Sequence, residues 1–215
     1  TLTIKPAVLS IESAVAENKN FDNTNSATVT NVNFSGLKNG QTLEYGTDYT
    51  ATGVFAQSDA GEDISVTVTV KLLENDKTKN YVVSPVTKPD AAKATIRKTV
   101  ATLAISAAGA VYSGNAYATS NITVTSNVTN PTVEYTFYSD ADCQNEIPAP
   151  VNAGTYYVKG SIAATTNTTA VTSGSVSFTI AAKDINAEDV TVDTIGAQTY
   201  TGSAITPDVV VRDGS

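Results

Sequence analysis

The chain has 215 residues, with 13 basic and 21 acidic side chains, no histidine and one cysteine. Its net charge of −8 disfavours nucleic acid and anionic lipid as partners, and the lack of an apolar run of about 20 residues excludes a membrane-spanning helix. Without histidine, a Ser-His-Asp or Cys-His nucleophile and a His-ligated zinc or iron site are excluded, and a lone cysteine forms no internal disulfide.

The first predicted unit covers residues 1–97 and consists of short strands separated by turns. Its clearest strand has Ile64, Val66, Val68, Val70 and Leu72 on one face and mostly hydroxylated residues on the other. Such alternation is typical of a strand with one buried and one solvated side. We expect further strands in this unit at residues 7–11, 27–34 with a break near Asn31, 49–55 and 94–97.

The second predicted unit covers residues 98–183 and has the same character. We expect its strands near residues 103–105, 122–124, 133–137, 152–162 and 176–180. No segment in either unit has the 3.6-residue periodicity of an amphipathic helix. Short strands at this spacing, with turn residues between them, predict an all-β fold of tandem immunoglobulin-like β-sandwiches in a linear array.

One segment of the second unit resembles strand F of an immunoglobulin domain. The segment Asn-Ala-Gly-Thr-Tyr-Tyr-Val is similar to the Asp-x-Gly-x-Tyr-x-Cys sequence of that strand. The resemblance implies that Gly154 lies in the turn before the strand, that Tyr156 forms a tyrosine corner, and that Val158 takes the place of the cysteine.

Residues 184–215 are predicted to begin a third unit. They hold only the first two or three strands of a sandwich, which would leave an apolar face uncovered. One hypothesis is that another chain completes this part in a head-to-tail manner. The alternative is that the segment docks on the second unit of its own chain.

An internal repeat supports this division. Aromatic residues followed by turn residues occur as Phe21-Asp22-Asn23, Tyr112-Ser113-Gly114 and Tyr200-Thr201-Gly202, and the aromatics are 91 and 88 residues apart. A period near 90 residues is the size of one immunoglobulin-like sandwich and is too long for a solenoid repeat.

Short motifs connect both units to known families. Residues 18–24, 27–29, 59–61 and 80–81 resemble the YDG-type repeat of bacterial surface proteins, and residues 112–114, 135–138 and 152–156 resemble a related bacterial Ig-like repeat, the MBG type. Residues 198–207 are similar to the opening of another such repeat. The resemblance implies a large exported or wall-attached protein in which the repeats are spacers or adhesive stalks, and it carries no catalytic residue or cofactor.

A few residues are candidates for chemistry. Carboxylates are the ligands that Ca²⁺ prefers, and two acidic runs supply them: Asp59, Glu62 and Asp63, and separately Asp140 and Asp142. Neither run has the spacing of a known calcium loop, and solvated acidic turns explain both. Cys143 is an ordinary loop thiol or, with Gln144, a thioester. A lysine–asparagine cross-link beside a buried carboxylate is a further alternative, for which Lys5, Lys71 and Lys159 are the candidates.

The sequence therefore predicts a non-catalytic structural segment of a bacterial secreted or cell-surface protein, outside the cell. Its expected partners are neighbouring repeats of the same protein. Two alternatives stay open: a module that binds a host glycan or protein, and an ancillary part of a secreted carbohydrate-active enzyme. No metal or organic cofactor is expected.

Overall fold

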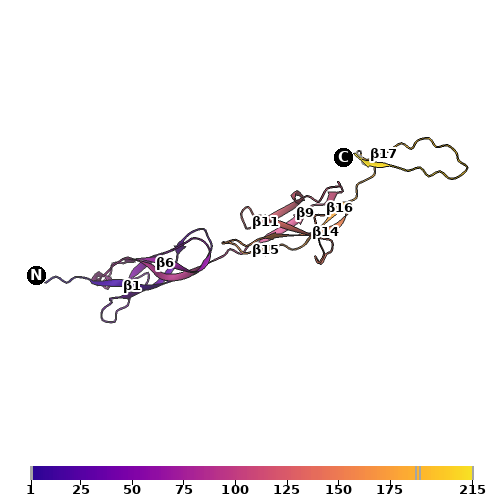
Figure 1. Cartoon of the computed structure of the whole chain (residues 1–215). Helices are drawn as coiled ribbons and strands as arrows, with labels where there is room; N and C mark the ends of the chain where they lie inside the picture. Colours follow the sequence, from indigo (N-terminus) through magenta and orange to yellow (C-terminus); the bar gives the residue numbers. More distant parts are fainter. Residues whose placement is uncertain (1, 187, 189, 215) are drawn as a thin grey trace. The chain divides into compact units, whose positions relative to one another are not determined.

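The computed structural model describes residues 2–186, 188 and 190–214, and it confirms the predicted all-β fold (Figure 1). The chain divides into two compact units. The first comprises Thr1–Thr102 together with Ala163–Val171, and the second comprises Leu103–Ile162 together with Thr172–Ser215. The division differs in detail from the predicted boundaries near residues 97 and 183, which stay predictions.

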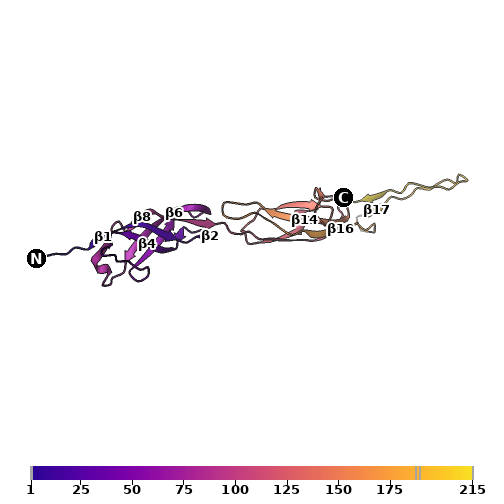
Figure 2. The ribbon, with the colours of Figure 1, turned by 90° about the horizontal axis from the view of Figure 1, so that it is seen from below.

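The first unit contains two sheets. One has three strands in the order β4-β1-β7, and the other has five in the order β2-β8-β6-β5-β3. Their bounds are β1 (Ala7–Ala16), β2 (Lys19–Asn20), β3 (Ser26–Ala27), β4 (Val29–Ser35), β5 (Tyr49–Phe55), β6 (Gly61–Leu72), β7 (Tyr81–Val83) and β8 (Thr87–Arg97), with one 3-10 turn, η1 (Thr78–Asn80). Figure 2 shows β1 and β4 beside β6 and β8.

The two sheets of the first unit share one apolar core. Leu9 and Ile11 of β1 lie in the same buried cluster as Val66 and Val68 of β6 and Phe55 of β5. In β5 and in the middle of β6, buried residues alternate with more exposed ones, as the period-two pattern predicted. This shared core makes the unit a two-layer sandwich.

Some strands of the first unit differ from those predicted. The break in the second predicted strand falls at Thr28, between β3 and β4, and not at Asn31. Strand β7 had no counterpart in the prediction. Strand β8 begins at Thr87 because Asp90, with a φ of 50°, forms an irregularity that lets pairing with β6 continue on both sides of it.

The second unit also has two sheets. The larger has the order β10-β16-β14-β12-β13, with β15 also paired to β14, and the smaller pairs β9 with β11. Their bounds are β9 (Leu103–Ala107), β10 (Ala110–Val111), β11 (Ile122–Ser126), β12 (Glu134–Tyr138), β13 (Glu146–Ile147), β14 (Gly154–Ile162), β15 (Val171–Thr172) and β16 (Val176–Ala181), with the 3-10 turn η2 (Thr119–Asn121).

The core of the second unit is smaller and more aromatic. The rings of Tyr117 and Phe178 stack with centroids 4.0 Å apart, and Phe137 packs edge-on at 6.0 Å from Phe178. Val158 of β14 is fully buried among them. The buried residues of this cluster are distinct from those of the first core.

The remaining strands are β17 (Val190–Val192) and β18 (Val211–Asp213), which form an antiparallel pair. Arg212 and Asp193 form an ion pair of 2.8 Å beside it, and hydrogen bonding to Asp193 raises the pKa of Arg212. Completion of this segment by another chain stays a prediction.

In each unit the early strands and the last long strand lead the chain from one end of the sandwich toward the other, although residues 163–171 return to the first unit. In the first unit β1 starts beside Tyr81, and after its ten residues the chain soon reaches β2, which lies next to the end of β8 (Figure 2). In the second, Leu103 lies against Gly160, near the start of β16, and β16 then runs to Ala181. The described residues contain no helix long and apolar enough to cross a membrane.

Candidate functional site

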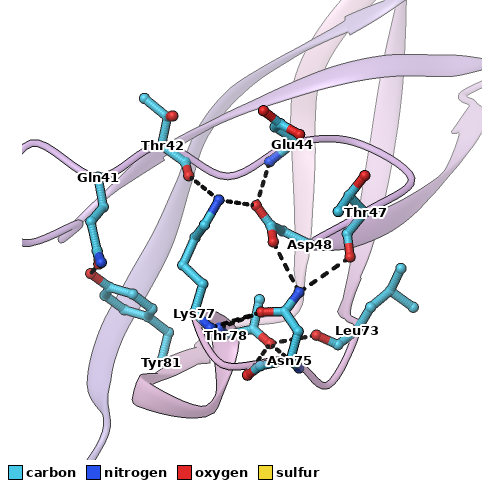
Figure 3. Close-up of polar contacts among 10 residues, drawn as sticks. All are labelled: Gln41, Thr42, Glu44, Thr47, Asp48, Leu73, Asn75, Lys77, Thr78 and Tyr81. Carbon is cyan, nitrogen blue, oxygen red and sulfur yellow. Dashed lines mark hydrogen bonds and ion pairs between the residues drawn. The ribbon is translucent and has the colours of Figure 1, made fainter.

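The main buried polar cluster of the first unit surrounds Asp48, which directly precedes β5 and is only 2% exposed. One carboxylate oxygen accepts hydrogen bonds from the Lys77 ammonium at 2.7 Å and from the Glu44 backbone N–H at 2.9 Å. The other oxygen accepts a hydrogen bond from the Asn75 amide at 2.9 Å (Figure 3). We call Asp48, Asn75, Lys77 and Thr78 the Asp48 cluster.

The Asp48 cluster ties two loops together. The Asn75 side-chain oxygen accepts hydrogen bonds from the backbone N–H groups of Lys77 and Thr78, both at 2.9 Å. The hydroxyl of Thr78 donates to the Leu73 carbonyl. Figure 3 shows the Lys77 side chain reaching from this loop to Asp48 and to the carbonyl of Thr42, 3.1 Å away. Residues 42–48 are thereby fixed to residues 73–78.

The charges of Asp48 and Lys77 favour a structural role over a reactive one. The hydrogen bond from Lys77 lowers the pKa of Asp48. Burial raises that pKa, but by less than the hydrogen bonds lower it. The same bond raises the pKa of Lys77. Both groups are therefore ionised near neutral pH, whereas a nucleophilic amine or a condensation to an amide would require the neutral forms. The arrangement holds a loop, and its charges offset each other.

The predicted acidic positions are spread over separate loops and do not meet. The Asp59 carboxylate accepts a hydrogen bond from the Asn167 amide at 2.9 Å, and Asp63 lies at an irregularity of β6 with a φ of 50°. Backbone N–H groups of Gln144 and Asn145 bond to Asp140 and lower its pKa. Among the described residues there is no group of three or more acidic, cysteine or histidine side chains that could hold a metal ion.

We therefore expect Ca²⁺ to leave the stability of the chain unchanged. Asp59 and Asp140 already accept hydrogen bonds from protein donors, and in the described part of the chain neither belongs to a group of three ligand side chains that could hold the ion. Thermal unfolding with millimolar CaCl₂ and with a chelator measures this directly. A rise in the melting temperature with Ca²⁺ that is absent in an Asp140→Asn variant would show that the loop binds the ion.

The other candidates for covalent chemistry occupy ordinary positions. Cys143 is partly exposed, and its sulfur lies 3.8 Å from the Ala141 carbonyl of the same loop. Lys71 is exposed on β6, and the Lys159 ammonium lies 5.5 Å from the centre of the Tyr138 ring. Neither lysine lies beside a carboxylate in the contacts that the structure describes.

The repeated aromatic residues occupy equivalent positions in the two units. Phe21 donates its backbone N–H to the Arg97 carbonyl at 2.8 Å, and Tyr112 donates to the Ala181 carbonyl at 2.9 Å. Two residues later Asn23 has a φ of 62° and Gly114 a φ of 75°. Asparagine tolerates this left-handed conformation, so the turn is alike in both units although the sequence differs. Tyr200 is 85% exposed, with the same kind of turn at Gly202.

Tyr156 lies on β14 with its ring against the second core, 6.0 Å from Phe178. Its hydroxyl donates to the Asn152 carbonyl at 3.1 Å, four residues upstream. A Tyr hydroxyl bonded to a carbonyl shortly before its strand is the arrangement of a tyrosine corner. Gly154 is the first residue of β14 and not part of the turn before it, and a side chain there would meet the Tyr156 ring.

The sequence marks no residue of the Asp48 cluster as a candidate site. Residues 74–77 have the composition of a solvated turn, and Lys77 lies 29 residues after Asp48 in the chain. No local pattern reveals such a pairing, because it depends on which loops meet at one end of the sandwich.

The sequence of the first unit matches a known protein family. The family model of the YDG domain matches residues 5–88. The first unit contains a YDG domain. The match includes β1 to β7, the start of β8, the turn after Phe21 and the whole Asp48 cluster. A search of curated proteins finds no match to the chain. The cluster is therefore a structural feature within the YDG domain of this chain.

Proposed function

We propose that this chain is a non-catalytic structural segment of a large bacterial secreted or cell-surface protein, with its units acting as spacers in an adhesin-type array. The second unit and the segment from residue 184 are, in this proposal, further Ig-like repeats, the second of the MBG type. Neighbouring repeats are the partners.

The proposal rests on the path that the chain takes through each unit. A spacer gains reach when the chain enters each unit at one end and leaves at the other, because each unit then adds its full length. In the first unit β1 runs ten residues between these ends, which is about 30 Å of strand. An enzyme or receptor has no such requirement.

The polar interior agrees with this role. Among the described residues, no buried side-chain nitrogen or oxygen lacks a hydrogen-bond partner. The buried polar atoms of the Asp48 cluster hold the two loops together. These buried polar side chains thus stabilise the fold of the unit.

A binding screen tests the proposal against its alternatives. The purified chain, immobilised and exposed to a glycan panel and to host matrix proteins, should show no saturable binding. Tyr138 of β12 and Tyr157 of β14 are directly paired aromatic residues. Saturable binding that a Tyr138→Ala or Tyr157→Ala variant removes would favour a recognition module instead. A neighbouring domain with a pair of catalytic carboxylates in the full gene would favour the ancillary part of a carbohydrate-active enzyme.

A further inference from the structure

In both units a two-residue strand near the start pairs in parallel with the end of the last long strand. In the first unit β2 pairs with the end of β8, Lys19 with Ile96 and Asn20 with Arg97. In the second unit β10 pairs with the end of β16, Ala110 with Ile180 and Val111 with Ala181. The N–H of Phe21 or Tyr112 adds one more bond at the far end of each pairing. We call these pairings the terminal clamps.

The direction of the clamps matters when the chain is pulled by its two ends. Parallel strands point the same way, so the segment before the clamp is drawn backwards while the last strand is drawn forwards. The two strands must then slide along each other, and all bonds between them carry the load together. An antiparallel pair pulled from its open end instead loses its bonds one at a time.

The clamp of the first unit has side-chain fastenings. The Asn18 side chain accepts a hydrogen bond from the Thr95 N–H at 2.7 Å. The Lys19 ammonium bonds to Asp22 at 2.7 Å and to the Thr24 carbonyl at 2.8 Å, which closes the turn after Phe21. Hydrogen bonds from Lys19 and Thr24 lower the pKa of Asp22 to about 2, so the turn stays charged over the physiological range.

The clamp of the second unit lacks these fastenings. Gly109 and Ala110 occupy the positions of Asn18 and Lys19, and neither has a side chain that can donate or accept a hydrogen bond. The last strand is also held less: β16 pairs with β14 over five residues, whereas β8 pairs with β6 on both sides of its irregularity, from Gly61 to Thr69.

We propose that the terminal clamps are the elements of this chain that resist force, and that the clamp of the first unit withstands more force than that of the second. Under load the second unit then unfolds first and extends the chain, while the YDG domain keeps its fold. This inference rests on the proposed spacer function for its purpose, although the clamps themselves are properties of each unit.

Single-molecule pulling on the whole chain tests the ordering. We expect two unfolding events, of which Tyr112→Pro weakens only the lower-force one and Phe21→Pro only the higher-force one. Each proline removes one clamp donor, so the unfolding rate at a given force should rise by roughly five-fold. The controls Tyr112→Phe and Phe21→Leu keep the backbone N–H and should change this rate much less. A lower-force event that responds to Phe21→Pro would overturn the ordering.

A second pulling direction tests the clamp without altering it. In a Cys143→Ala background, the substitution Lys38→Cys lets the first unit be pulled between its N-terminus and the loop just after β4. Strands β1 and β4 are antiparallel and adjacent there, so they should separate pair by pair at clearly lower force. Equal forces in the two directions would overturn the clamp. A result that contradicts the clamp proposal would not contradict the spacer role, because that role depends on the length of the chain and not on the force it withstands.

Discussion

Replacing Asp48 with alanine should lower the free energy of unfolding of the first unit by about 3 kcal/mol. The substitution removes the acceptor of three hydrogen bonds, from Lys77, Asn75 and the Glu44 N–H. A buried donor left without a partner costs more than the bond itself contributed. Urea unfolding followed by tyrosine fluorescence measures the change, since Tyr49 is the next residue and is fully buried.

The chain offers a matched control for this experiment. Asp76 and Lys79 form an ion pair with the same 2.7 Å separation, but the Asp76 side chain is fully exposed and that of Lys79 is 63% exposed. Because solvent screens such a pair, Asp76→Ala should give no measurable change. Equal losses in the two variants would mean that burial does not decide the strength of the pair, and the structural role assigned to the Asp48 cluster would be wrong.

The ion pair of Asp48 and Lys77 predicts how the stability of the first unit depends on pH. The pKa of Asp48 is lowered by folding, so its contribution is present above the unfolded value of about 3.9 and is lost as pH falls through the folded pKa. The pKa of Lys77 is raised, so its contribution is present below about 10.4 and is lost as pH rises through the folded value. Asp48→Ala should flatten both limbs of the curve.

Replacing Phe178 with alanine should destabilise the second unit by about 4 kcal/mol, enough to unfold it at moderate temperature. Phe178 is 4% exposed and contacts the rings of Tyr117, Phe137 and Tyr156. This core is small, so a lost ring is a large fraction of it. Phe178→Leu fills part of the space and should cost much less.

Calorimetry distinguishes the units in this experiment. The buried residues of the two cores are separate, so Phe178→Ala should shift one thermal transition and leave the other in place. Two transitions that move together by the same amount would instead indicate one cooperative fold. That result would contradict the division into units on which the repeat interpretation depends.

Alternation along the chain was enough to predict the fold class and the main strands. In β6 the residues Ile64, Val66, Val68 and Val70 are buried, and in β14 Val158 and Ile162 are. These strands are long and half-buried, so a period of two is visible in the sequence. Strand β7 was missed because three residues cannot display a period, and β8 was shortened because Lys88-Pro89-Asp90 reads as a turn.

The functional features were less accessible from the sequence. The repeat of Phe21 and Tyr112 was visible, but their shared hydrogen bond to the end of the last strand was not, because it joins segments about 70 residues apart or more. Parallel pairing of terminal strands leaves no mark in composition or spacing. Asp48 likewise owes its burial to Lys77, which a local pattern does not connect to it.

The spacer role itself is tested most directly by reach on a cell surface. An epitope tag is displayed from a bacterial wall anchor, either directly or with this chain between tag and anchor, and its accessibility to a bulky antibody is measured. A pair of unrelated sandwich domains of equal length serves as the control. We predict that the chain and the unrelated pair expose the tag equally and that direct attachment hides it. A tag that stays hidden behind this chain, while the unrelated pair exposes it, would contradict the spacer role.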